Sequence, residues 1–136
     1  MLKDSQQALK WYRKAIFECD DPEAHVGIGR LYYQGNGVQK SIATACEHWK
    51  KVYAKNSPNS GLYLGNAYIK KDVDRAKIYL EYAAKNEYFL AFGKLARIAF
   101  DEGRYIKGIK LLVKGFMLGR RLLKISPTDS RLLGIE

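Results

Sequence analysis

The sequence predicts an all-α protein: a right-handed α/α solenoid of about three helix pairs, with an extra helix before them and a capping segment after them. Stretches with helical spacing of apolar residues alternate with short breakers along all 136 residues. No stretch combines apolar and polar alternation with β-branched enrichment, so strands are not expected. One pattern of small and large residues also recurs at intervals of 37, 31 and 32 residues, and such a period is typical of stacked helical hairpins.

Capping residues and breakers mark where each helix is expected to begin and end. Asp4 is positioned to cap the first helix, and Asp72 opens a later one. Asp21 and Ser57 each precede a proline, which suits the first helical position. Gly103 follows an apolar stretch at a place where a helix should end. The expected helices lie near residues 4–19, 22–34, 41–55, 58–69, 72–85, 87–102 and 105–123, with a short one near 127–133.

Small residues recur at matching places in the predicted helix pairs. In the second helix of each pair, and in the first helix of the chain, a small residue precedes large side chains three and four positions later. These small residues are Ala8, Ala45, Ala76 and Gly108. In the intervening helices an apolar residue is followed by a glycine, at Gly29, Gly65 and Gly93. Small residues let helix backbones approach closely, so we expect these glycines to be packing positions.

The segment GIGRLYYQGNGV, residues 27–38, raises the alternative of a phosphate-binding loop. A dinucleotide fingerprint needs a strand before its glycines and a helix after them. Here Gly27 and Gly29 fall inside a predicted helix, and a tyrosine replaces the third glycine of the motif. Gly35 and Gly37 follow the helix end, where a left-handed residue is favoured. We therefore expect helix packing and a turn rather than a phosphate site.

Residues 24–54 resemble a Sel1-like repeat, a relative of the tetratricopeptide repeat. The family pattern runs from Ala through Leu-Gly, Leu-Tyr and Gly-x-Gly-Val into a second helix that carries Trp and Lys. The residues that match this pattern are Ala24, Gly29, Leu31, Tyr32, Gly35, Gly37, Val38, Ala45, Trp49 and Lys51. The resemblance implies an α/α superhelix that binds proteins and usually catalyses nothing.

The resemblance weakens along the chain. Residues 57–86 lack the Gly-x-Gly-Val turn, and Tyr88 and Gly108 replace alanines of the family pattern. We expect a single domain over residues 1–136. Its parts are a second-type helix at 4–19, repeats at 22–55 and 57–86, a divergent repeat at 87–119, and a cap or tail at 120–136.

Cysteine usage favours a reducing compartment. Cys19 and Cys46 show neither metal-ligand nor disulfide-framework spacing, so both are expected to be buried or half-buried free thiols. The N-terminal residues show no secretory signal, and no apolar run is long enough to span a membrane. We expect a cytoplasmic protein of bacterial type.

No catalytic arrangement emerges from the ionisable residues. His25 and His48 have no nucleophile placed beside them by spacing. His48 occupies a packing position, and His25 is expected to be a solvated or locally bonded ring. The acidic pairs Asp20–Asp21 and Asp101–Glu102 stand at helix ends, where capping and surface roles are usual. We expect a non-enzyme without cofactor or metal; an enzyme that uses Cys46 or His48 is the less favoured alternative.

A protein partner is expected on the first helices of the repeats, which line the concave face in many solenoids. Positions −3, +1 and +4 from each recurring glycine share one helix face, and each row combines apolar with polar or basic side chains. The alternative is that the apolar members only complete packing between neighbouring pairs. The candidate binding residues are Val26, Arg30 and Tyr33; Leu62, Asn66 and Ile69; and Leu90, Lys94 and Arg97.

Positive charge gathers at the C-terminal end. The formal net charge is +10, and residues 104–136 hold eight basic against two acidic side chains. A basic stripe with apolar flanks predicts either a helix covered by a cap or one that meets a partner or an anionic membrane. Nucleic acid is not favoured, because no reading module and no row of stacking aromatics accompanies the charge. The stripe comprises Lys107, Lys110, Lys114, Arg120, Arg121 and Lys124.

Apolar residues flank this basic stripe on both sides. One flank holds Tyr105, Ile109, Leu112, Phe116 and Leu123, the other holds Leu111, Leu118 and Leu122, and Leu132, Leu133 and Ile135 would supply the cap. A non-catalytic adaptor is the favoured function, and a peripheral membrane or polyanion-binding protein is the alternative. At the other end, helix 4–19 has no first helix before it, so it either caps the fold or pairs with another copy.

Overall fold

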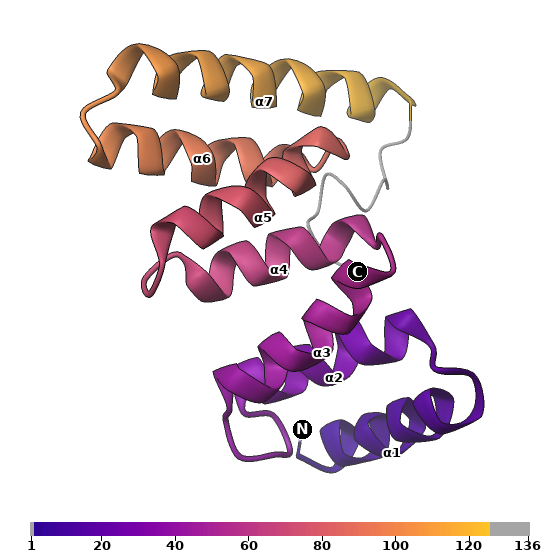
Figure 1. Ribbon diagram of the computed structural model, residues 1–136. Helices are drawn as coiled ribbons and strands as arrows, with labels where there is room; N and C mark the ends of the chain where they lie inside the picture. The colour runs from indigo at the N-terminus through magenta and orange to yellow at the C-terminus, as the bar shows by residue number, and fades with distance from the viewer. Residues whose placement is uncertain (1, 126–136) are drawn as a thin grey trace. The chain divides into compact units, whose positions relative to one another are not determined.

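The computed structural model describes residues 2–125 and shows seven α-helices within that range (Figure 1). They are α1 (Leu2–Cys19), α2 (Pro22–Gln34), α3 (Ile42–Ala54), α4 (Pro58–Tyr68), α5 (Val73–Lys85), α6 (Phe89–Asp101) and α7 (Tyr105–Ile125). No strand occurs among these described residues, and the all-α prediction is confirmed. The short helix expected near 127–133 lies outside the described residues.

The chain divides into two compact units, with the boundary between Ser60 and Gly61 inside α4. In unit 1, α2 packs against both α1 and α3 (Figure 1). In unit 2, α6 packs against both α5 and α7, and α4 lies close to α5. The structure thus presents the expected single domain as two compact units.

Two helix starts follow the predicted capping chemistry. Asp21 and Asp72 each accept a hydrogen bond from the backbone N–H two or three residues later, at 3.2 and 3.1 Å. The predicted cap at Asp4 is wrong, because α1 already begins at Leu2 and Asp4 lies in its first turn. There the carboxylate still interacts favourably with the positive end of the helix dipole. Gly35 ends α2 with φ +74°, as the turn prediction requires.

Glycine makes room for a large side chain of the neighbouring helix in both units. A Cβ on Gly29 would lie under 3.0 Å from the Trp49 ring, and one on Gly65 would lie under 3.0 Å from Leu80. Protein interiors are too densely packed to absorb such an overlap without a shift. The packing prediction is therefore confirmed at both positions. At Gly93 it is wrong, because a Cβ there would meet nothing within 4 Å.

Each unit has a buried apolar interior. In unit 1 the Trp49 side chain is 1% exposed, and its Nε1 donates to the backbone oxygen of Val26 at 3.3 Å. In unit 2 the second helix of one pair packs against the first helix of the next. That core comprises Leu62, Leu80, Ala83, Tyr88, Ala91, Leu95 and Ile98.

Substituting two glycines that occupy equivalent repeat positions tests the packing role. Gly29→Ala should lower the free energy of unfolding by about 1–3 kcal/mol, because the new methyl group must displace the buried Trp49 ring. Gly93→Ala is the matched control, and it should be neutral or stabilising by up to about 1 kcal/mol, since alanine favours helix. Urea unfolding followed by circular dichroism measures both, and equal effects would contradict the packing role.

Candidate functional site

The nine predicted partner-binding residues differ in accessibility. Val26 and Leu62 are 1% and 4% exposed, so they complete helix packing, as the alternative interpretation held. Their burial corrects the assignment of these two residues to an accessible surface. Leu90 and Arg97 are exposed, and Arg30, Tyr33, Asn66, Ile69 and Lys94 are half-buried.

Two of the predicted residues, Ile69 and Arg97, line one groove of unit 2. The groove has a volume of about 440 Å³ and lies between the α4–α5 connection and the C-terminal end of α6. Its lining combines apolar side chains with charges of both signs. Lys70 and Val73 were not predicted, because Lys70 lies in the α4–α5 connection and Val73 begins α5, both outside the repeated face. The full lining is Ile69, Lys70, Val73, Asp74, Arg97, Ile98, Asp101 and Glu102.

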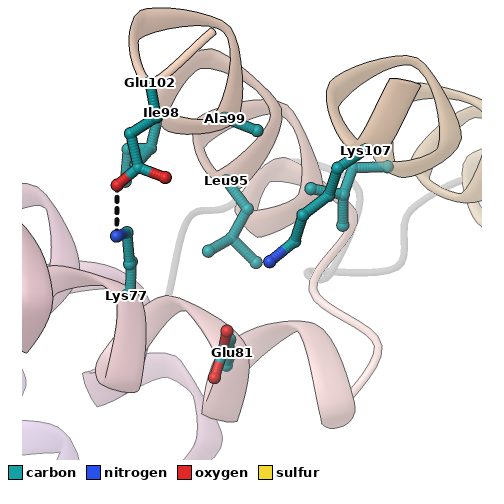
Figure 2. A pocket seen from close by; sticks show the side chains of 8 residues that line it. Lys77, Glu81, Leu95, Ile98, Ala99, Glu102 and Lys107 are labelled. Atoms are coloured by element: carbon teal, nitrogen blue, oxygen red, sulfur yellow. Dashed lines mark ion pairs between the residues drawn. The ribbon is translucent and has the colours of Figure 1, made fainter. Parts of the chain in front are cut away.

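A smaller cavity of about 80 Å³ lies between α5, α6 and the first turn of α7 (Figure 2). Lys77 and Glu102 form an ion pair among its lining residues. The hydrogen bond from Lys77 lowers the pKa of Glu102, and the same bond raises the pKa of Lys77. The two charges therefore stabilise each other in their ionised forms. A cavity of this size is well below the volume of about 300 Å³ at which small-molecule sites begin.

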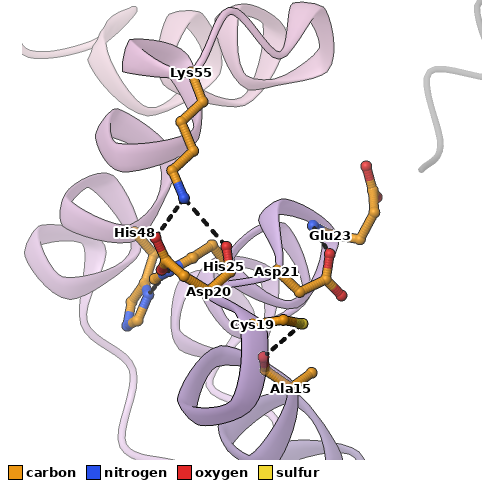
Figure 3. A network of polar contacts seen from close by, with 8 residues as sticks. All are labelled: Ala15, Cys19, Asp20, Asp21, Glu23, His25, His48 and Lys55. Atoms are coloured by element: carbon orange, nitrogen blue, oxygen red, sulfur yellow. Dashed lines mark hydrogen bonds and ion pairs between the residues drawn. The ribbon is translucent and has the colours of Figure 1, made fainter.

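Both histidines belong to a polar network in unit 1 (Figure 3). The Nδ1 atoms of His25 and His48 lie 2.8 Å apart, and Nε2 of His25 donates to Oδ1 of Asp20 at 2.8 Å. Lys55 forms an ion pair with the same carboxylate. His25 is 2% exposed, so the prediction of a solvated ring is wrong, whereas that of a locally bonded ring is confirmed. The network thus links the end of α1 to α2, to the middle of α3 at His48 and to the C-cap of α3 at Lys55.

The chemistry of this network is structural. Hydrogen bonds from Lys55 and His25 lower the pKa of Asp20 to about 2, so its carboxylate stays ionised. Because the Nε2–H of His25 faces that carboxylate, the two facing Nδ1 atoms share a single proton. The Tyr32 ring stacks near His48, with centroids 6.4 Å apart. These contacts join residues of α2 and α3 with Asp20, which follows α1, and Lys55, which follows α3.

The two thiols differ in accessibility. Both are free, and Cys46 is buried as expected. Cys19 is exposed, which corrects the prediction, because it occupies the last position of α1 and donates to the backbone oxygen of Ala15 at 3.2 Å. Within residues 2–125, no three potential His, Cys, Asp or Glu ligands gather into a group that would hold a metal ion.

The glycines of residues 27–38 serve packing and a turn. Gly27 and Gly29 lie inside α2, and a Cβ on Gly27 would lie under 3.0 Å from the Tyr12 ring. Gly35 and Gly37 have φ values of +74° and +71°, which glycine adopts at little cost. A dinucleotide loop instead places its glycines between a strand and a helix. The two helical glycines therefore bring α2 close to the helices on either side of it.

The predicted basic stripe is exposed along α7. Its six members, Lys107, Lys110, Lys114, Arg120, Arg121 and Lys124, all have exposed side chains. On one flank Leu122 is buried, and Leu111 and Leu118 are half-buried. The other flank, which comprises Tyr105, Ile109, Leu112, Phe116 and Leu123, is 47–67% exposed. The expected cap residues Leu132, Leu133 and Ile135 lie outside the described residues.

Paired helices with recurring small residues at their contacts define a helical-repeat protein. The chain belongs to the Sel1 repeat family, whose model matches residues 1–16, 22–57 and 60–88. Proteins of this family generally mediate protein–protein interactions. In the described part of the chain, no helix is both long enough and apolar enough to traverse a bilayer.

Two relatives illustrate the similarity. The crystal structure of a Sel1 repeat protein from Oxalobacter formigenes matches with a TM-score of 0.75 at 22% identity, over 98% of this chain and 58% of that one. The ERAD-associated E3 ubiquitin-protein ligase component HRD3B of Arabidopsis thaliana is 35% identical over 80 residues, which are 54% of this chain and 12% of that protein. The chain thus spans less than two thirds of the length of either relative.

The histidine network predicts a loss of stability in mild acid. Burial lowers the pKa of His48, the charges of His25 and Lys51 act in the same direction, and Glu47 opposes them. The unfolded chain, with a histidine pKa near 6.5, therefore binds this proton more readily than the folded chain. The stabilisation is present above about pH 6.5 and is lost as the pH falls below it. Protonation of Asp20 causes a second loss of stability, as the pH decreases from 3.8 to about 2.

Urea unfolding between pH 7.5 and 5 measures the first of these losses. The wild type should lose stability over that range, and His48→Tyr, which keeps a ring without a titrating nitrogen, should lose less. A variant with an undiminished pH dependence would contradict the assignment to His48.

Proposed function

We propose that the chain is a non-catalytic adaptor that binds a partner protein through the groove of unit 2. The observation that carries this proposal is the convergence of Ile69 and Arg97, two residues of the predicted binding face, on one groove of about 440 Å³. Half-buried Lys94 and exposed Leu90 extend the same face along α6. Membership of the Sel1 repeat family supports a protein as the ligand.

The lining of the groove indicates the kind of segment it would accept. Ile69, Val73 and Ile98 offer an apolar contact area. Lys70 and Arg97 carry positive charge on the same lining, and Asp74 and Asp101 carry negative charge. A segment with an apolar side chain between an acidic and a basic residue would complement both features.

Unit 1 carries a second part of the proposed binding face. The Tyr33 ring is half-buried and lies 5.5 Å from the Trp49 ring, centroid to centroid. Its position is therefore fixed by a buried partner, and the tyrosine hydroxyl supplies a polar end that suits a protein interface. Arg30 is half-buried on the same helix.

Further proposals concern the cellular setting and the assembly of the protein. Free thiols at Cys19 and Cys46 support a reducing compartment such as the cytoplasm as the place of action. HRD3B is by its name a component of a ligase, and this supports an adaptor role for the present chain. A homodimer through α1 is a further proposal, supported by Trp11 and Phe17, which are 60% and 92% exposed.

Glutamate substitutions inside and outside the groove test the adaptor proposal. In the groove, Val73→Glu and Arg97→Glu should each reduce capture of the same partner from the native host at least about tenfold, because they alter exposed lining positions. The matched controls outside the groove, Ile78→Glu and Lys85→Glu, also lie at exposed positions of unit 2 and should leave capture unchanged.

Quantitative mass spectrometry of the captured proteins gives the readout, and circular dichroism checks that every variant is folded. Equal capture by the groove variants and the wild type would refute the assignment of the groove. Equal losses in the groove variants and the controls would refute it as well.

A further inference from the structure

Helix α7 is anchored on one side only. A Cβ on Gly108 would lie under 3.0 Å from the Phe100 ring, and one on Gly115 would lie 2.9 Å from Cβ of Phe92, so both glycines face α6 at close range. Leu122 is 1% exposed. At 100° per residue these three positions fall within an arc of about 40°. The opposite side of α7 is therefore turned away from α6, except at its first residue, where the Tyr105 ring lies 6.3 Å from the Phe100 ring, centroid to centroid.

That opposite side is apolar. We call it the α7 apolar face, and it comprises Tyr105, Ile106, Ile109, Val113, Phe116 and Met117. These six side chains are 51–74% exposed. They fall within an arc of about 120° of the helix. Large apolar side chains that are scattered singly over a surface need no explanation, but a contiguous patch of this kind marks an interaction site.

A basic rim borders the α7 apolar face. Lys107, Lys110, Lys114 and Arg121 occupy the next 60° or so of the helix, between the apolar face and the packed side. From residue 104 to residue 125 the sequence contains no Asp or Glu. Arg121 also forms an ion pair with Glu87. The excess positive charge of the rim is therefore carried by Lys107, Lys110 and Lys114.

The cations of the C-terminal half of α7 line two shallow hollows. Lys114 lines a hollow of about 520 Å³ beside Phe92 and Met117, and the ion pair of Arg121 with Glu87 lies on the same lining. Arg120, Arg121 and Lys124 line another of about 330 Å³, again beside Met117. Each hollow thus places positive charge next to an apolar side chain. This combination suits a phosphate headgroup whose acyl chain continues over an apolar surface.

We propose that α7 binds the surface of an anionic phospholipid bilayer, a function separate from the proposed groove of unit 2. In this arrangement the helix lies parallel to the membrane. The α7 apolar face enters the boundary between headgroups and acyl chains, and the basic rim contacts lipid phosphates. Helix α7, with 21 residues, is about 30 Å long, so contact can extend along its whole length.

Charge and shape favour a bilayer over the other occupants. A second copy would bring two basic rims together, and their repulsion would oppose association. A partner helix is normally held in a groove between two elements. The α7 apolar face instead belongs to the outer side of one helix, and the hollows described along α7 adjoin its cations. A convex apolar face with a cationic border is the arrangement of interfacial helices.

Vesicle flotation of the full chain tests this proposal. The probes are vesicles of phosphatidylcholine alone and of phosphatidylcholine with about 30% phosphatidylglycerol, at about 0.1 M and 0.5 M salt. Binding to the anionic vesicles should exceed binding to the neutral ones at least about tenfold at low salt. It should fall severalfold at high salt without vanishing, because the apolar contact is not screened.

Paired substitutions separate the two contributions. Ile106→Glu with Phe116→Glu, and separately Lys110→Glu with Lys114→Glu, should each reduce anionic-vesicle binding at least about tenfold. The control pair on α5 is Ile78→Glu with Lys85→Glu. It lowers the net charge of the chain more than the Ile106 and Phe116 pair does, yet it should leave binding nearly intact. All of these positions are exposed, and circular dichroism checks the fold of each variant.

Three results would overturn the proposal. The first is a folded full chain that does not float with anionic vesicles. The second is binding that is indifferent to the Ile106 and Phe116 substitutions, which would indicate simple adsorption of a polycation. The third is a wild-type dimer that Phe116→Glu converts to a monomer in sedimentation, which would make a second copy the occupant.

Discussion

The close approach of neighbouring helices over glycine is the constraint on which both units depend. In unit 1, Gly27 and Gly29 let α2 meet the rings of Tyr12 and Trp49 on its two sides. The Trp49 ring is nearly fully buried and donates a hydrogen bond to a backbone oxygen of α2. Since each ring occupies the volume that a Cβ would need, the sequence at these positions determines the distance between helices. In unit 2, Gly108 plays the same part for α7 against α6.

This packing determines which residues are available for binding. Side chains that face a neighbouring helix, such as Val26 and Leu62, are buried in the core and cannot contact a partner. The accessible residues on which the two proposals depend lie around the groove of unit 2 and on the outer side of α7. Two ion pairs also lie within the units, between exposed Asp20 and Lys55 in unit 1 and between Lys77 and Glu102 in unit 2. These pairs join successive helices of each unit and stabilise the fold, whereas recognition depends on other accessible side chains.

The sequence predicted the repeats well because their signals are local. Asp21 and Asp72 cap helices through hydrogen bonds to residues two or three positions away, so the chain itself reveals them. Gly93 shows the limit of periodicity: it occupies the repeated position, but no side chain of a neighbouring helix reaches it. The His25 and His48 contact joins residues 23 positions apart, which no spacing rule anticipated. The groove also depends on Lys70 and Val73, which lie at the junction of α4 and α5, where no residue pattern repeats along the chain.

A double-mutant cycle between Gly29→Ala and Trp49→Leu measures the central constraint most directly. If the tryptophan ring fills the space above the glycine, a smaller side chain at position 49 relieves the overlap that the alanine methyl creates. The double variant should then be less destabilised than the sum of the single variants by about 1 kcal/mol or more. Additive effects, within about 0.3–0.5 kcal/mol, would contradict the account.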